Sequence, residues 1–241
     1  MRIRLVLPHG SQEYRSGLAE ELGMLVAPVV ELEVLGLSHA VERIDSAYHQ
    51  VLVAPHLVEE VARAEREGCD AVAVDCPGDA VLRALKEAVR IPVVGVAEAG
   101  ILYALALGDR FSVLSSLPET ARMIEESIRA RGLRERLASV RAVSVPGAEQ
   151  GNHDRAAKAL LAAARQAIAE DGADVVVLGH AGTPSLARGL AAELPVPVVD
   201  PAPAAIELAR SLVSMGIVQS KVCFPQPRAK DGGQLPGRAW R

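Results

Sequence analysis

The stretch "DAVAVDCPGD", residues 70–79, decides the fold, because it recurs in the second half of the chain as "DVVVLGHAGT", residues 174–183. Each copy runs as a short apolar segment into a turn that contains glycine, which is typical of a buried strand followed by a tight turn. Cys76 lies at the turn of the first copy and His180 at the same place in the second. The segments "IPVV" and "VPVV" follow at nearly matching distances, so the chain is predicted to be a duplication of one plan.

Strand-like and helix-like segments alternate along both halves. Strands are predicted at residues 2–7, 29–37, 70–75, 91–96, 110–116, 138–145, 173–179 and 196–200. Helices are predicted at residues 14–26, 56–68, 80–89, 97–108, 118–132, 153–172, 184–194 and 202–216. This order predicts an α/β fold with two similar doubly wound parallel sheets, whose ligand sites lie beyond the carboxyl ends of the strands. Two halves that face each other would enclose a cleft, with Cys76 and His180 on opposite walls.

The composition excludes several classes of partner. Half of the 241 residues are hydrophobic, yet only two Phe, three Tyr and one Trp are present, so the core is built from Ala, Val, Leu and Ile. The formal net charge of −4 gives no strongly basic field, which weighs against nucleic acid and anionic membranes and favours a small molecule. No apolar run approaches the length of a membrane span or a signal peptide, so we expect a cytoplasmic protein.

The three cysteines form no metal-like pair and no disulfide framework. Cys69 precedes its strand and is expected to be a small buried hydrophobe, whereas Cys76 has a suggestive position. A thiol at a strand-to-helix turn lies near the positive end of the helix, which favours the thiolate. Cys76 is therefore either a base or nucleophile, or a packed and inert cysteine.

His180 is the second candidate for proton transfer. It is flanked by Gly179, Ala181 and Gly182, which would let a ligand approach closely, and imidazole titrates near neutral pH. A histidine bonded to loop carbonyls is the competing interpretation. The position of His180 opposite Cys76 in the repeat favours catalysis.

The blocks "DAVAVDCPGDAVLRALKEAVRIPVVGVAEA" and "DVVVLGHAGTPSLARGLAAELPVPVVDPAPAA" resemble the two active-site blocks of the aspartate/glutamate/hydantoin racemase superfamily, and within it the hydantoin and allantoin racemases. The resemblance extends from residue 1 to about residue 224 and includes "RFSVLSSLP". It implies two α/β domains related by a pseudo-twofold, an active site in the cleft between them and no cofactor. It also implies a pair of opposed cysteines, of which Cys76 matches the first, while His180 stands in the place of the second.

The same resemblance implies the domain boundaries. The last helix returns to the first domain, so residues 1–97 with 209–224 form one domain and residues 98–208 the other. The tail, residues 225–241, has a loop-like composition and is expected to be disordered. We also expect a homo-oligomer.

The expected substrate contacts lie in the loops around the two catalytic residues. The first loop carries His9, Gly10 and Ser11 where the family has an Asn-Thr pair, and Ser115 and Ser116 align with a Thr-Thr pair. The remaining candidates are the turn residues Pro77, Gly78, Ala181 and Gly182, together with Glu98, which matches a family glutamate. Glu98 is otherwise an ordinary acid in the first turn of a helix.

Acids near strand ends have structural interpretations as well. Asp200 is expected to cap a helix. Asp75 and Asp79 bracket Cys76, and a negative charge there would raise the pKa of the thiol.

The leading hypothesis is a cofactor-independent racemase or epimerase. Cys76 removes the proton next to a carbonyl of a small hydantoin, allantoin or amino-acid-like compound on one face, and His180 returns a proton on the other. Two alternatives remain open. One is a cysteine-dependent isomerase or decarboxylase of a small dicarboxylate, in which a decarboxylase would use a protonating cysteine. Cys76 as a nucleophile with His180 as its base would make an isomerase or a hydrolase. The other is a binding or regulatory protein that has kept the cleft and lost one catalytic group.

Overall fold

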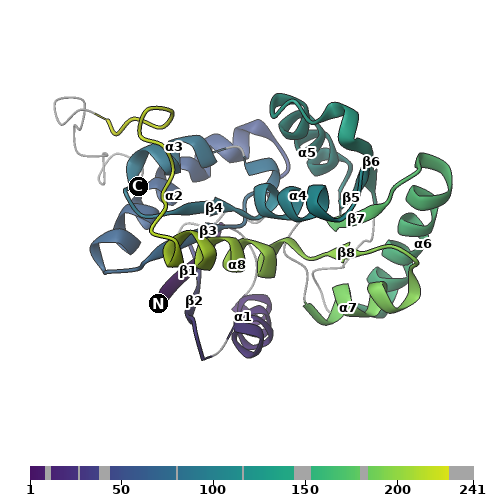
Figure 1. Cartoon of the computed structure of the whole chain (residues 1–241), viewed down its shortest axis with the longest axis horizontal. Helices are drawn as coiled ribbons and strands as arrows, with labels where there is room; N and C mark the ends of the chain where they lie inside the picture. The colour runs from purple at the N-terminus through teal and green to yellow at the C-terminus, as the bar shows by residue number, and fades with distance from the viewer. Residues whose placement is uncertain are drawn as a thin grey trace.

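The computed structural model describes residues 1–8, 12–26, 28–37, 44–79, 81–115, 117–143, 153–179 and 184–227. Two four-stranded parallel sheets form its frame, with the strand orders β2-β1-β3-β4 and β6-β5-β7-β8 (Figure 1). Because the two orders are equivalent along the chain, the predicted α/β fold with two similar parallel sheets is confirmed.

The first half supplies sheet A and the helices between its strands. Its elements are β1 (Arg2–Leu7), α1 (Gln12–Val26), β2 (Glu31–Gly36), α2 (Ala47–Arg66), β3 (Ala71–Val74), the short 3-10 helix η1 (Pro77–Asp79), α3 (Leu82–Ala88) and β4 (Val93–Gly95). Gly68 follows α2 with a φ of 80°, a conformation that glycine adopts without strain. The predicted stop of this helix is therefore confirmed.

The second half repeats the arrangement around sheet B. Its elements are α4 (Val96–Leu107), β5 (Phe111–Ser115), α5 (Pro118–Ala130), η2 (Arg134–Arg136), β6 (Leu137–Ala142), α6 (His153–Asp171), β7 (Val175–Leu178), α7 (Pro184–Glu193), β8 (Val198–Val199) and α8 (Pro201–Ser214). No helix within the described ranges is long and apolar enough to cross a membrane.

Alternation along the strands separates three hydrophobic cores. On β1, Ile3, Leu5 and Leu7 face a central core, while Val6 faces an outer core under α2 and α3. On β7, Val175 and Val177 enter the same central core, and the remaining strand residues face α6 and α7. The central core is therefore shared by both sheets.

Two helices cross between the halves through this central core. Helix α4 follows β4 of sheet A but packs on β7 of sheet B, and α8 follows β8 but packs on β1, β3 and β4 of sheet A. The two helices lie side by side (Figure 1). Gly100 of α4 lies close to Pro201 of α8, and a Cβ on Gly100 would come within 3.2 Å of Pro201. The exchange of α4 and α8 therefore joins the two halves closely, while the residue boundaries predicted for the two domains stay a prediction.

The segment after α8 crosses the end of α3 that lies far from Cys76. The Gln219 amide donates to the carbonyl of Ile91 at 2.8 Å, and Lys221 Nζ donates to the carbonyl of Lys86 at 2.7 Å. These bonds satisfy one carbonyl in the last turn of α3 and another in the segment between α3 and β4. The expected disordered tail lies outside the described residues from residue 228 onward, so that expectation stays a prediction.

Candidate active site

Cys76 lies just beyond the carboxyl end of β3, on the strand that pairs with both β1 and β4. Its side chain is only 1% exposed and belongs to the outer core with Val74, Leu82 and Leu85. Among the three cysteines, Cys69 is also buried, as expected, and burial raises the pKa of its thiol. Cys76 is therefore a buried thiol beyond the carboxyl end of its strand, the end at which parallel α/β sheets generally bind ligands.

The turn after Cys76 has an unusual backbone. Gly78 has a φ of 65° and Asp79 a φ of 53°, in the left-handed region. A Cβ at Gly78 would lie 2.9 Å from the carbonyl oxygen of Met123 on α5, so the glycine is required both by φ and by the neighbouring helix. The amide of Asp79 donates to the carbonyl of Cys76 at 2.9 Å, which closes the turn.

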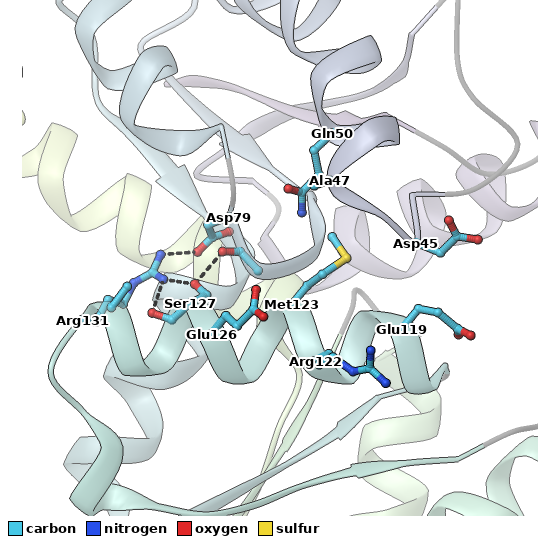
Figure 2. A pocket seen from close by; sticks show the side chains of 12 residues that line it. Asp45, Ala47, Gln50, Asp79, Glu119, Arg122, Met123, Glu126, Ser127 and Arg131 are labelled. Atoms are coloured by element: carbon cyan, nitrogen blue, oxygen red, sulfur yellow. Dashed lines mark hydrogen bonds and ion pairs between the residues drawn. The ribbon is translucent and has the colours of Figure 1, made fainter.

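Helix α5 of the second half contacts this turn directly (Figure 2). The Ser127 hydroxyl donates to the carbonyl of Gly78 at 2.6 Å, and the Arg131 guanidinium donates to Asp79 Oδ2 at 3.1 Å. Arg131 also donates to the hydroxyl and the carbonyl of Ser127. The Met123 side chain packs against the outer core that contains Cys76. The turn is thus built by both halves.

Asp79 is the most perturbed acid in this region. Its side chain is 1% exposed, and burial raises its pKa to about 7. The positive charge of Arg131 opposes this shift, and the negative charge of Glu98 adds to it. The backbone amide of Glu98 donates to Asp79 Oδ2 at 2.6 Å, which places the carboxyl group at the start of α4. Asp79 therefore changes charge near neutral pH.

Glu98 and Ser115, two predicted substrate contacts, are engaged within the protein. Both carboxylate oxygens of Glu98 accept from Lys86 Nζ at 2.7 Å, which links α4 to α3. Ser115 Oγ lies 2.6 Å from the hydroxyl of Thr120 and donates to the carbonyl of Leu117 at 3.0 Å. These bonds account for both side chains locally, and their contact with substrate stays a prediction. Asp200 caps α8 as expected, accepting from the amide of Ala202 at 3.0 Å.

Several predicted site residues fall outside the described part of the chain. They are His9, Gly10, Ser11, Ser116, His180, Ala181 and Gly182. Of Pro77 the structure describes only the backbone, at the start of η1. The predicted pairing of Cys76 with His180 across a cleft therefore stays a prediction.

A pocket of about 530 Å³ opens beside the Cys76 turn (Figure 2). The start of α2, the turn at Gly78 and the face of α5 line it. Its charged lining residues are Asp45, Asp79, Glu119, Arg122, Glu126 and Arg131. Within the described ranges, no group of three His, Cys, Asp or Glu side chains could hold a metal ion.

Comparison with known proteins agrees with this architecture. The Asp/Glu/Hydantoin racemase family profile matches residues 3–209. The chain belongs to this family. It is 38% identical over 234 residues to the hydantoin racemase of Paenarthrobacter aurescens, a match that covers 95% of this chain and 99% of the relative.

Solved structures give the same result. The allantoin racemase from Pseudomonas fluorescens superposes with a TM-score of 0.88 at 31% identity, covering 95% of this chain and 97% of the other. An arylmalonate decarboxylase superposes with a TM-score of 0.64 at 20% identity, covering 90% of this chain and 94% of the other. At that identity the second similarity shows the fold alone.

Sequence reasoning missed the residues that hold the Cys76 turn in place. Ser127 and Arg131 come from a helix whose local sequence predicts only an exposed charged face, and Arg131 is 52 residues away from Asp79. Lys86 likewise gave no signal of its contact with Glu98. In the sequence, only the position of Asp79 directly after Pro-Gly indicated an unusual turn.

Proposed function

We propose that the protein is a cofactor-independent racemase of a small hydantoin-like compound, such as a 5-substituted hydantoin or allantoin. The observation that carries the proposal is the match along nearly the whole chain to a hydantoin racemase, together with a buried thiol at the carboxyl end of β3. The arylmalonate decarboxylase similarity supports the fold only, so no observation favours decarboxylation.

In the proposed mechanism, the Cys76 thiolate takes the proton from the carbon next to the ring carbonyl. The electron pair of the broken C–H bond moves into the ring as an enolate, and Cys76 becomes a neutral thiol. Protonated His180 then donates its proton to the opposite face of the same carbon, which completes the inversion. The opposite enantiomer is converted by the reverse transfers, with His180 as base.

Racemisation and proton exchange together test this proposal. Each enantiomer of a hydantoin panel and of allantoin is incubated in deuterated solvent, with polarimetry for inversion and mass spectrometry for deuterium uptake. A reaction without enzyme measures the spontaneous exchange of these acidic carbons. We expect loss of rotation from both enantiomers with one deuterium incorporated, and no turnover by a folded Cys76→Ser variant.

Variants at His180 test the second proton transfer. Since removal of a positioned acid or base costs on the order of 10² to 10⁴ in rate, His180→Ala should slow inversion by that factor and slow exchange on the Cys76 face far less. His180→Cys should retain activity, because a thiol then stands on each face. Equal inversion rates for wild type and His180→Ala would remove His180 from the mechanism. The absence of any turnover on the panel would favour a binding protein.

A further inference from the structure

Besides the local bond from the Asp79 amide to the Cys76 carbonyl, the Cys76 turn is held by side chains from α5. Arg131 contacts the turn through Asp79 at 3.1 Å, and Ser127 through the carbonyl of Gly78 at 2.6 Å. Arg131 also donates to Ser127, so the two residues of α5 act as one hydrogen-bonded unit. The Met123 carbonyl fills the space where a side chain at position 78 would lie. Through these contacts the second half fixes the turn of the first.

Asp79 also joins this turn to the start of α4. Helix α4 begins after Gly95, which has no side chain to cap the first turn, and the Asp79 carboxylate accepts from the amide of Glu98 instead. Its second oxygen, Oδ1, is buried and has no hydrogen-bond partner within the described ranges. A Cβ on Gly95 would collide with this carboxylate, so the backbone approaches it closely. A buried carboxylate in this setting needs a compensating charge.

We propose that Arg131 is a positioning residue for Cys76, acting through Asp79 to hold the thiol-bearing turn against α4 and α5. Its guanidinium is 28% exposed, while the carboxylate that it pairs with is 1% exposed. Removal of Arg131 leaves the buried carboxylate without its cation, and the turn then opens so that Asp79 reaches water. The expected effect of Arg131 on catalysis rests on the proposed function. Its effect on the closed conformation of the Cys76 turn does not depend on that function.

The charge of Asp79 makes the opening of the turn depend on pH, which a contact without a titrating group would not do. In the closed turn its pKa is raised to about 7 by burial, and in an open, hydrated turn it would return toward the ordinary value of an aspartic acid. Opening therefore becomes easier as the pH rises toward 7 and changes little above it. The charged groups that act on Asp79 are Arg131, directly after α5, and Glu98 on α4, which pairs with Lys86 on α3. The pocket that Asp79 lines also contains Glu119, Arg122 and Glu126 on α5 and Asp45 before α2.

The test is alkylation of the full-length protein by iodoacetamide, with the three cysteines followed separately by peptide mass spectrometry. The exposed Cys223 is the internal standard, and the buried Cys69 reports global unfolding. For Arg131→Gln at pH 8, we expect alkylation of Cys76 relative to Cys223 to rise about tenfold through local opening, with Cys69 unchanged. If the proposed function holds, kcat falls by about tenfold to a hundredfold, since a misplaced catalytic group loses rate, while KM changes less.

Four further variants separate the loss of charge compensation at Asp79 from general damage to α5. Asp79→Asn removes the buried charge, so the double variant Asp79→Asn with Arg131→Gln should label at the rate of Asp79→Asn alone. The ratio of wild-type to Asp79→Asn labelling should rise between pH 5 and pH 7 and then stay constant. Arg131→Lys keeps the charge and should restore much of the protection. The matched control is Arg129→Gln, because Arg129 pairs only with Glu125 of its own helix among the contacts described.

The outcomes separate this inference from the proposed function. Unchanged Cys76 labelling in Arg131→Gln, or an equal rise in Arg129→Gln, overturns the positioning role even if the wild type is an active racemase. A flat wild-type to Asp79→Asn ratio between pH 5 and pH 7 overturns it as well. Increased labelling that the double variant reverses supports it, including in a protein that turns over none of the tested hydantoins.

Discussion

Helices α4 and α8 hold equivalent places in the two halves, yet their first turns are capped in different ways. Each follows the edge strand of one sheet and packs on the other sheet. Helix α8 begins at Asp200, whose own carboxylate accepts from the amide of Ala202 at 3.0 Å. Helix α4 begins after Gly95 and takes its carboxylate from Asp79, which accepts from the amide of Glu98 at 2.6 Å.

The difference shows how one half of a duplicated fold can acquire an additional link. The carboxylate of Asp200 caps the helix that directly follows it in the sequence. Asp79 instead joins three elements, because the same carboxylate contacts the start of α4 and Arg131 of α5, and its own backbone closes the Cys76 turn. The Cys76 turn of the first half is thereby coupled to α4, which crosses between the halves, and to α5 of the second half.

The largest expected effect concerns the pH dependence of stability. Because the folded-state pKa of Asp79 is raised to about 7, its contribution is fully favourable below about pH 4 and is lost as the pH rises through 7. Three pKa units correspond to about 4 kcal/mol at most. Asp79→Asn should therefore show a free energy of unfolding, relative to wild type, that increases from pH 4 to pH 7 and then stays level.

Urea unfolding of both proteins at a series of pH values measures this effect. The matched control is Asp200→Asn, in which the local cap keeps an acceptor oxygen. Parallel stability curves for wild type and Asp79→Asn across this range would show that the pKa of Asp79 is not raised in the folded state. The two caps would then not differ in their electrostatic contribution to stability.

A substitution at Gly95 tests the close approach that the non-local cap requires. A Cβ there would overlap the Asp79 carboxylate, so Gly95→Ala should lower the free energy of unfolding by about 2–3 kcal/mol. The control is Gly189→Ala in α7, where nothing lies within 4 Å of the new Cβ, and where we expect a gain of about 0.5–1 kcal/mol. Chemical denaturation compares the two, and equal effects would contradict the close packing at α4.

The smallest effect is expected at the local cap. Asp200→Ala removes one acceptor from the first turn of α8 and should cost about 1 kcal/mol. The loss should stay confined to stability, with Cys76 alkylation unchanged, because the bond that is removed lies within the first turn of α8. Labelling of Cys76 that increased as much as in Arg131→Gln would show that the two caps are coupled through α4 and α8.

Much of the fold was readable from the repeated segments. The continuous apolar runs within "DAVAVD" and "DVVVLG" predicted two buried parallel strands, and both were found as the strands next to the centre of equivalent sheets. The cap at Asp200 was also predicted, because an acid before Pro-Ala-Pro is a local signal for the start of a helix. Cys76 was placed correctly at the end of its strand for the same reason.

The contacts that hold the Cys76 turn in place could not be predicted from the sequence. Nothing near Asp79 in the sequence specifies a partner, and neither Ser127 nor Arg131 differs in pattern from other polar residues on an exposed helix face. Glu98 resembled either a substrate ligand or an ordinary first-turn acid, and only the fold brought Lys86 within 2.7 Å of it.

The sequence by itself determined the elements, their order and the two turns, because hydrophobic periodicity, glycine at turns and local caps act within a few residues. The tertiary structure alone decided which half supports which turn. Because the Asp79 carboxylate is buried away from water, it needs a cation and hydrogen-bond donors close to it. Arg131 and the start of α4 supply them, and both are distant in the sequence. A contact between residues that are 52 positions apart leaves no repeating pattern in the sequence. It forms only when α4 and α5 pack around the Cys76 turn.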